Sequence, residues 1–227
     1  MSNFYRIILL FIIFVFLSTF NPQDLNPILK TNKTLFKIQT IDIKNNFLIT
    51  KSEVEEKLIN IYKKNIFFLK KEDIEKPLRE ISFLEKIEVK KKYPDTIIIE
   101  IFETKPLAIL FKEKNKYILD NLGNVINYQN ISNFGKLPSV FGDGAENNFI
   151  NFYDELKKEN FPISKIKSFY FFQIDRWDLE LLNNMLVKFP NNKRKNSIAK
   201  SIELLNRKDF INYKIIDLRI EGKIIVE

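Results

Sequence analysis

The sequence predicts an α+β protein in which one apolar N-terminal helix precedes two folded regions. Residues 4–20 read FYRIILLFIIFVFLSTF, and no comparable apolar run recurs in this chain of 227 residues. Between residues 36 and 104 the hydrophobic period changes from strand to helix and back, which gives the order β-α-α-β-β. From residue 105 to 227, short alternating runs between turn signals predict a mostly antiparallel β region with flanking helices.

The N-terminal run predicts a membrane-spanning helix. Its uninterrupted core from Ile7 to Leu17 has eleven residues, and at roughly −0.3 to −0.6 kcal/mol each these favour insertion by about −3 to −7 kcal/mol. A rise of ~1.5 Å per residue gives the run about 25 Å, slightly less than a ~30 Å hydrocarbon core. We expect a transmembrane helix over residues 4–22 after a short cytoplasmic tail of residues 1–3. The membrane-embedded side chains are then Phe4, Ile7, Ile8, Leu9, Leu10, Phe11, Ile12, Ile13, Phe14, Val15, Phe16, Leu17 and Phe20.

Two other interpretations of the apolar run stay open at this point. A cleaved signal peptide could have this length, although the sequence lacks a small-x-small cleavage site after the apolar core; the second is a buried core helix. Charge does not fix the orientation, because Arg6 flanks one side while Lys30, Lys33 and Lys37 flank the other. Long domains translocate largely regardless of such charges. We therefore expect the body of the protein outside the cytoplasm, joined to the helix by a juxtamembrane linker over residues 23–35.

Composition excludes several kinds of chemistry. The chain has no cysteine and no histidine, so it has no disulfide, thiolate nucleophile or Ser-His-Asp triad, and it lacks the ligands of most zinc sites. The net charge of +8 could mark a polyanion-binding surface. Acidic residues interleave with the lysines, however, and the basic clusters at 90–92 and 193–195 each adjoin a turn. We expect no nucleic acid, small-molecule substrate, cofactor, metal or catalytic residue.

The first folded region begins with a strand near Phe36 to Ile43. Thr50 and Glu53 form a capping box, which predicts a helix over 51–62. A second helix is expected over 73–81, with Asp73 as N-cap and Pro77 therefore in the first turn, where a missing N–H is tolerated. Two strands over 84–92 and 96–102 complete the unit.

The second region contains more and shorter elements. A hairpin over 107–112 and 116–119 is expected first, then a short strand at 125–126, and the segment 137–144 is interpreted as a loop. The remaining elements are a helix over 147–159, strands over 166–175, 178–182 and 185–189, a helix with Ile198, Ile202 and Leu205 on one face, and two strands over 213–220 and 223–226.

Several motifs resemble a known family. Residues 89–96 read VKKKYPDT, and the following strand ends in glutamate before KPLA at 105–108. DNLGNV at 120–125, Leu137-Pro138 with Gly142, RWDL at 176–179 and DLR at 217–219 follow in order. This arrangement is similar to the FtsQ/DivIB family of bacterial cell-division proteins, which contain a POTRA (polypeptide-transport-associated) domain. The tail before the apolar run is shorter than in many relatives, and Ile220 stands where many of them have tyrosine.

The resemblance implies a POTRA domain at 36–104 and a C-terminal β domain at 105–227. It also implies a non-enzymatic scaffold of the inner membrane, with its body in the periplasm, enriched at the division septum. Such a scaffold binds the FtsB–FtsL pair and so links early and late division proteins. The partner-binding positions carried over by motif are Arg176, Arg219, Ile220, Lys223, Ile224, Ile225 and Val226.

Each of these assignments has a structural alternative. The last strand could be an ordinary sheet edge that is too short and charged to pair, and Arg219 could pair locally with Asp217 or Glu221. Trp177 is expected in the core. Asp178 and Glu180 lie on one strand face as a glycosidase pair would, but a solvated face explains them better.

Two other functions remain open for the whole chain. One is a membrane-tethered POTRA module with a chaperone-like role in export or outer-membrane assembly. The other is a tethered wall hydrolase, for which the sequence offers no distinctive catalytic cluster.

Overall fold

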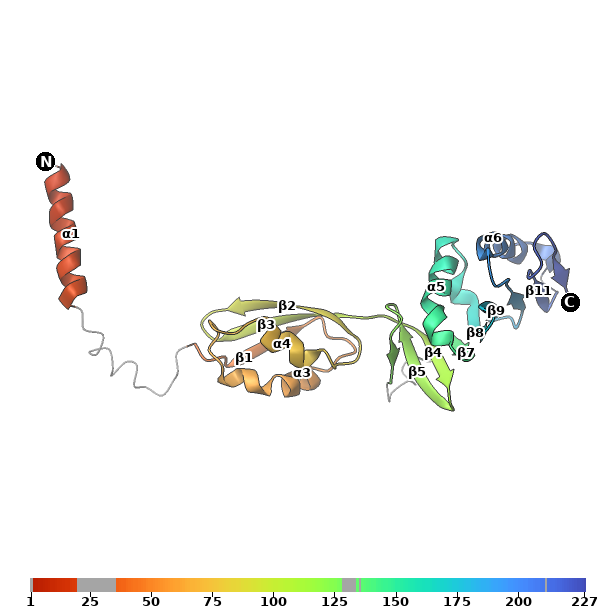
Figure 1. The fold of residues 1–227 in the computed structure, drawn as a ribbon, viewed down its shortest axis with the longest axis horizontal. Coiled ribbons are helices and arrows are strands. Elements are labelled where there is room, and N and C mark those ends of the chain that lie inside the picture. The colour runs from red at the N-terminus through yellow and green to blue at the C-terminus, as the bar shows by residue number, and fades with distance from the viewer. Residues whose placement is uncertain (1, 20–35, 128–133, 135, 211) are drawn as a thin grey trace.

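The computed structural model describes residues 2–19, 36–127, 134, 136–210 and 212–227. Helix α1 (Ser2–Thr19) is followed by a three-stranded unit and by a nine-stranded sheet with its own helices (Figure 1). The predicted α+β class is confirmed. The expected membrane residue Phe20 and the linker 23–35 lie outside the described residues.

Helix α1 carries the apolar run of the sequence. Its side chains from Phe4 to Leu17 are exposed all around the helix. Within the described residues, no helix has both the length and the apolar character needed to cross a bilayer.

The three-stranded unit has the strand order β1-β3-β2. Strand β3 (Thr96–Glu103) pairs in parallel with β1 (Thr40–Lys44) and antiparallel with β2 (Leu84–Lys92). The predicted bounds of β2 and β3 agree with the structure to within one residue. Strand β1 begins four residues later than predicted, because Phe36 and Ile38 form backbone hydrogen bonds with residues 64–66 instead of with β3.

Two short helices cover this sheet. The capping box holds, since the Thr50 hydroxyl accepts a hydrogen bond from the Glu53 N–H at 3.3 Å. Helix α3 (Lys51–Lys57) is shorter than predicted and continues as a 3-10 turn, η2 (Ile59–Lys63). The expectation for the second helix was wrong in one respect. Helix α4 (Glu72–Leu78) has Lys71 as N-cap, so Pro77 lies in its last turn, and the helix ends one residue after it.

A carboxylate fixes the far end of this unit. The Glu103 side chain accepts hydrogen bonds from the backbone N–H groups of Phe47, Leu48 and Ile49 at 2.8–2.9 Å. Three consecutive N–H groups that converge on one anion form a nest, and bonds to a charged acceptor are stronger than neutral ones. The loop after β1 is thereby fixed to the end of β3.

The core of this unit includes residues of the next one. Most of its buried residues lie between residues 38 and 101, but Ile118 and Ile126 of the nine-stranded sheet belong to the same cluster. The rings of Phe83 and Phe134 also meet across this boundary, with centroids 6.2 Å apart. Continuous apolar packing therefore joins the two units.

The larger sheet has the order β12-β11-β10-β9-β8-β7-β4-β5-β6. Five of its pairings are antiparallel and three are parallel, so it is mostly antiparallel as predicted. The strands in chain order are β4 (Pro106–Lys112), β5 (Asn115–Asp120), β6 (Val125–Ile126), β7 (Ser139–Phe141), β8 (Ile166–Phe172), β9 (Arg176–Leu181), β10 (Leu186–Lys188), β11 (Ile215–Asp217) and β12 (Ile225–Val226).

Strand β7 was not predicted. It lies inside the expected loop 137–144, yet it pairs in parallel with both β4 and β8 at the middle of the sheet. Three residues between Pro138 and Gly142 give too short a pattern for recognition. Gly142 has a φ of +115°, and a Cβ there would meet the Phe171 carbonyl oxygen at 2.2 Å, so this close approach requires glycine.

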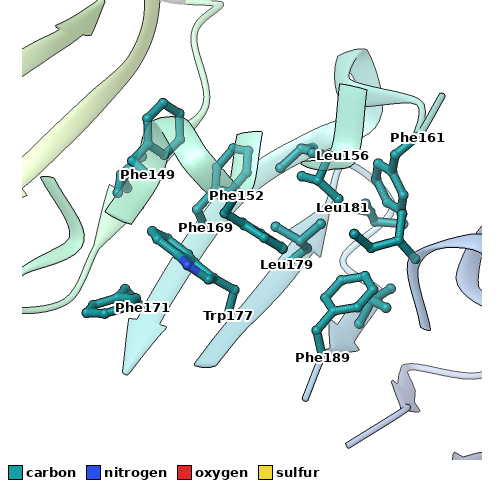
Figure 2. Close-up of a cluster of buried hydrophobic side chains, with 14 of the residues drawn as sticks. Phe149, Phe152, Leu156, Phe161, Phe169, Phe171, Trp177, Leu179, Leu181 and Phe189 are labelled. Carbon is teal, nitrogen blue, oxygen red and sulfur yellow. The ribbon is translucent and has the colours of Figure 1, made fainter. Parts of the chain in front are cut away.

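Helices α5 (Ala145–Lys158) and α6 (Arg194–Leu205) contribute to the core on one face of this sheet. Trp177 is fully buried there, as expected, and stacks on Phe152 with ring centroids 5.1 Å apart and planes 7° from parallel. Figure 2 shows Trp177 among aromatic rings from α5 and β8. On the opposite face, successive cross-strand partners form a row that runs from β7 to β12. Its members are Phe141, Tyr170, Asp178, Lys188, Asp217 and Ile225.

Candidate functional site

The last strand of the chain lies at the edge of the nine-stranded sheet. β12 pairs antiparallel with β11 through the register partners Ile216–Val226 and Asp217–Ile225. Glu227 and Ile215 exchange backbone hydrogen bonds at 3.1 and 3.2 Å. Because antiparallel partners alternate between bonded and non-bonded positions, the N–H and C=O of Val226 face away from β11. The predicted edge is therefore present, and within the described residues no strand pairs with the outer side of β12.

Both final strands are shorter than predicted. The expected strands over 213–220 and 223–226 reduce to three and two residues. Residues 218–224 instead form a turn around Gly222, which has a φ of +75°. The turn leaves Ile220, Ile224 and Ile225 exposed at the surface.

A groove of about 360 Å³ adjoins this edge. Its walls are the loop 190–193, the first half of α6 and the turn 218–224. Four of the seven carried-over positions line it, together with the lysines at 193 and 200. The sheet edge and the basic groove thus form one continuous surface, which we call the terminal edge: residues 190–193, Asn196, Ser197, Lys200 and 218–227.

Arg219 is held in the groove by a local ion pair. Its guanidinium donates hydrogen bonds to both carboxylate oxygens of Asp217, at 2.6 and 2.9 Å. The Arg219 backbone N–H also donates to Asp217 Oδ1, at 3.0 Å. The alternative of a local pair with Asp217 is therefore what the structure shows. The Arg219 side chain remains 42% exposed, so the pair orients the guanidinium without covering it.

The Asp217 carboxylate gives the site a pH dependence. Burial would raise the pKa of Asp217, but the hydrogen bonds from Arg219 outweigh it and lower the pKa below its ordinary value. A carboxyl with a lowered folded-state pKa stabilises the fold above its unfolded pKa of about 3.9, and this contribution is lost as pH falls through the folded value. Urea unfolding of wild type and Asp217→Asn should therefore differ most near pH 7 and converge toward pH 3.

The matched control is Asp209→Asn. Asp209 accepts a similar fork from Arg207, at 2.6 and 3.1 Å, but both partners are exposed. An exposed pair is screened by water and contributes little, so the effect of this substitution on the free energy of unfolding should be smaller. A difference between wild type and Asp217→Asn that is constant from pH 7 to pH 3 would contradict the role of this carboxylate.

Arg176 lies apart from the other carried-over residues. It begins β9, which is separated from β12 by β10 and β11. Its guanidinium lies 3.8 Å from the ring centroid of Phe172, and its Nε lies 3.4 Å from Asp178 Oδ1. Only 18% of the side chain is exposed. The structure therefore does not bring Arg176 into the groove with Arg219.

A row of alternating charge connects the two arginines. Asp178, Lys188 and Asp217 are register partners across β9, β10 and β11. Burial raises the pKa of Asp178, although the charges of Arg176, Lys188 and Arg219 act in the opposite direction. Sequence reasoning missed Lys188. The sequence did carry a signal for the two arginine–aspartate pairs. Each arginine stands two residues from an aspartate, and residues i and i+2 of a strand share one face.

Arg194 is a second residue whose role the sequence did not reveal. Its guanidinium donates two hydrogen bonds to the Glu155 carboxylate of α5, at 2.8 and 2.9 Å, and one to the Asn191 carbonyl, at 3.0 Å. Its side chain is largely buried. It therefore fixes the loop 190–193 and the start of α6, which are two walls of the groove.

Each carboxylate on this face lies beside a basic side chain. Glu180 accepts hydrogen bonds from Lys167 at 2.7 Å and from the Tyr170 hydroxyl at 2.8 Å, and these bonds lower its pKa. Asp178 faces Arg176. In the described part of the chain, no group of three or more potential ligands could hold a metal ion. The arrangement suits recognition of another chain through backbone pairing and basic side chains.

Two family models match the chain. A family model described as the FtsQ-type POTRA domain matches residues 36–104. A second model, described as the C-terminal part of the cell division protein FtsQ/DivIB, matches residues 108–219.

Individual relatives extend the match over most of the chain. The chain is 28% identical over 201 residues to the cell division protein FtsQ of Rickettsia conorii, covering 87% of this chain and 74% of that protein. It is 24% identical over 194 residues to FtsQ of Rhizobium meliloti, covering 85% of this chain and 63% of that protein. A solved extracytoplasmic domain of the cell division protein DivIB from Geobacillus stearothermophilus matches with a TM-score of 0.29 and 11% identity, covering 47% of this chain and 99% of that one.

Proposed function

Since this chain belongs to the FtsQ/DivIB family of bacterial cell-division proteins, we propose that it is a divisome scaffold that binds an FtsB–FtsL-like pair at its terminal edge. It acts by binding, and it holds early and late division proteins together. The single observation that carries the proposal is the exposed outer side of β12 beside a groove with four basic side chains, those of Lys193, Lys200, Arg219 and Lys223.

The physical basis is strand addition. An exposed edge presents unpaired N–H and C=O groups, and an extended segment of a partner can satisfy them by pairing as a further strand. Backbone pairing alone is indifferent to sequence. The basic side chains beside the edge supply selectivity for a segment that carries carboxylates next to its pairing residues.

Anchoring belongs to the same proposal. The apolar segment 4–22 holds the protein in the inner membrane after a cytoplasmic tail of residues 1–3, and residues 23–35 link it to the periplasmic body. The eleven uninterrupted apolar residues from Ile7 to Leu17 support this arrangement. We further propose that residues 36–104 and 105–227 act as a POTRA domain and a β domain, and that the protein is enriched at the division septum.

Val226→Pro is the sharpest test of strand addition. Val226 points its N–H away from β11, whereas Ile225 is a bonded register partner of Asp217, so a proline at 225 would disrupt the β11–β12 hairpin itself. Proline at 226 removes the outward donor and obstructs an incoming strand. We expect co-purification of an FtsB–FtsL-like pair with the full chain to fall by about tenfold or more, since a lost hydrogen bond (~1 kcal/mol) and a steric clash act together.

Val226→Ala is the matched control. Val226 packs partly against the core, and the alanine variant loses that contact while it retains the backbone N–H. Its co-purification should stay near that of wild type, and circular dichroism should show both variants folded. Wild-type capture by a folded Val226→Pro protein would exclude pairing at β12.

A further inference from the structure

One end of the three-stranded unit carries exposed aromatic rings, which we call the aromatic tip: Phe36, Phe67, Phe68 and Tyr93. The rings of Phe36 and Phe67 lie 4.7 Å apart, and Phe67 stacks on Tyr93 at 4.9 Å. Phe67 is 51% exposed, Phe68 82% and Tyr93 54%. Single exposed apolar residues are common, but a contiguous group of this kind marks an interaction surface.

The tip is a fixed part of the fold. The Ile66 N–H donates to the Phe36 carbonyl at 2.8 Å, and Lys37 forms a β-bridge with Asn65. Tyr93 belongs to the turn between β2 and β3, at the end of the unit where the arrowhead of β2 lies in Figure 1. Backbone hydrogen bonds therefore hold the segments that carry these rings next to one another.

Three lysines adjoin the residues of the aromatic tip. Lys37, Lys91 and Lys92 are exposed, and within the described part of the chain none of them forms an ion pair. Lys91 donates instead to the Phe67 carbonyl at 3.4 Å. Asp73 is paired with Lys64 at 2.7 Å. Asp95, in the same turn as Tyr93, accepts a hydrogen bond from the Thr96 hydroxyl at 3.0 Å, so the three lysines outnumber the one carboxylate of this turn.

The chain length limits the distance between this tip and α1. Sixteen residues, 20–35, separate the end of α1 from Phe36. At ~3.3–3.6 Å per residue they span at most about 55 Å. The aromatic tip is thus the part of the body at which the chain leaves for the apolar helix.

We propose that the aromatic tip docks on the surface of the bilayer that holds α1, with its rings among the headgroups and its lysines on anionic phospholipids. Aromatic side chains favour the interfacial region, and Lys side chains near an anionic surface add electrostatic attraction. This inference rests on the proposed anchoring of α1. It gives the body a defined pose on the membrane, with the terminal edge on a different part of the body.

The absence of cysteine from the chain permits a direct test with single-cysteine variants. The full chain is reconstituted in nanodiscs of phosphatidylcholine with or without phosphatidylglycerol, and an environment-sensitive fluorophore is attached at Phe68→Cys, Phe47→Cys or Ile12→Cys. Phe47 is the matched control, because it is 88% exposed and lies in the loop after β1, at the opposite end of the unit. Iodide quenching then reports the exposure of each label to water.

We expect strong protection from iodide at position 12 in all nanodiscs, protection at position 68 in those with phosphatidylglycerol, and no protection at position 47. Lys91→Glu with Lys92→Glu, or 1 M salt, which shortens the Debye length to ~3 Å, should restore quenching at position 68. Protection at 12 with equal quenching at 68 and 47 would overturn the docking while the anchor stands. Quenching at position 12 would overturn the anchor and the docking together. Protection at 68 that persists in the lysine variant would refute the role of anionic lipid.

Discussion

Arg219→Glu should abolish co-purification of the FtsB–FtsL-like pair with the full chain. The substitution replaces a cation that lines the groove beside β12 with an anion, next to Asp217 and Glu221. Buried or groove-lining arginines are frequent hot spots, whose loss costs ~2 kcal/mol or more, about 30-fold in affinity, and charge reversal adds repulsion of an acidic partner. The effect is measured as partner recovered per folded scaffold.

Arg207→Glu is the matched control for this experiment. Arg207 donates two hydrogen bonds to Asp209, which is also two residues away. Asp209 belongs to the 3-10 turn η5 (Lys208–Phe210), outside the groove. The two variants make the same charge change, and each breaks a pair with an aspartate two residues away, although only the Asp217 carboxylate is largely buried. Equal loss of partner in both would show that net charge, rather than the groove, governs capture.

Trp177→Ala should cause the largest loss of stability of any single substitution in the larger sheet. Trp177 is fully buried, and its ring contacts include Phe149, Phe152, Phe169 and Phe171. Deleting a buried aromatic side chain leaves a cavity and typically costs ~3–5 kcal/mol, a large part of the ~5–15 kcal/mol that stabilises a domain. Urea unfolding followed by circular dichroism measures this cost.

Trp177→Phe separates the size of the side chain from its position. Phenylalanine can retain the stack on Phe152 and fills most of the space, so its cost should be about 1–2 kcal/mol, below that of the alanine variant. Because the Nε1 of Trp177 has no hydrogen-bond partner within the described residues, the substitution breaks no such bond to a described group. A cost for Trp177→Ala below that of Trp177→Phe would contradict the packing described above.

The parts of the fold that local pattern determines were predictable. Strands β2 and β3 agree with expectation to within one residue, because the residues of β2 alternate, those of β3 are mostly β-branched, and the turn between them is marked by Tyr93, Pro94 and Asp95. The capping box at Thr50 likewise set the start of α3. The position of Pro77 was misjudged, because one acidic residue was taken for the N-cap when the helix begins earlier.

Long-range pairing explains the misses. Strand β7 has three residues, and both of its partners are parallel strands distant in sequence, so no local pattern marks it. The late strands were overestimated because apolar residues such as Ile220 and Ile224 continue the alternation into a turn that glycine permits at 222.

The candidate site was predictable in its position but not in its chemistry. The edge location of the last strand followed from its place after a hairpin turn, and the structure confirms it. The fork between Arg219 and Asp217 was one of two open alternatives. The charged row through Lys188 depends on the order of β9, β10 and β11, which the sequence could not supply, and the same order separates Arg176 from the groove.

The core that Ile118 and Ile126 share with the first unit has a consequence for biosynthesis. Both side chains are buried in a cluster whose other buried members lie between residues 38 and 101. A chain that emerges from its N-terminus can pair β1, β2 and β3 as soon as Glu103 is available, but it cannot close that core before residue 126 follows. The first unit therefore completes its core only after the β5–β6 hairpin of the second unit has been synthesised. A protease-resistant intermediate should arise only once the chain has emerged beyond residue 126.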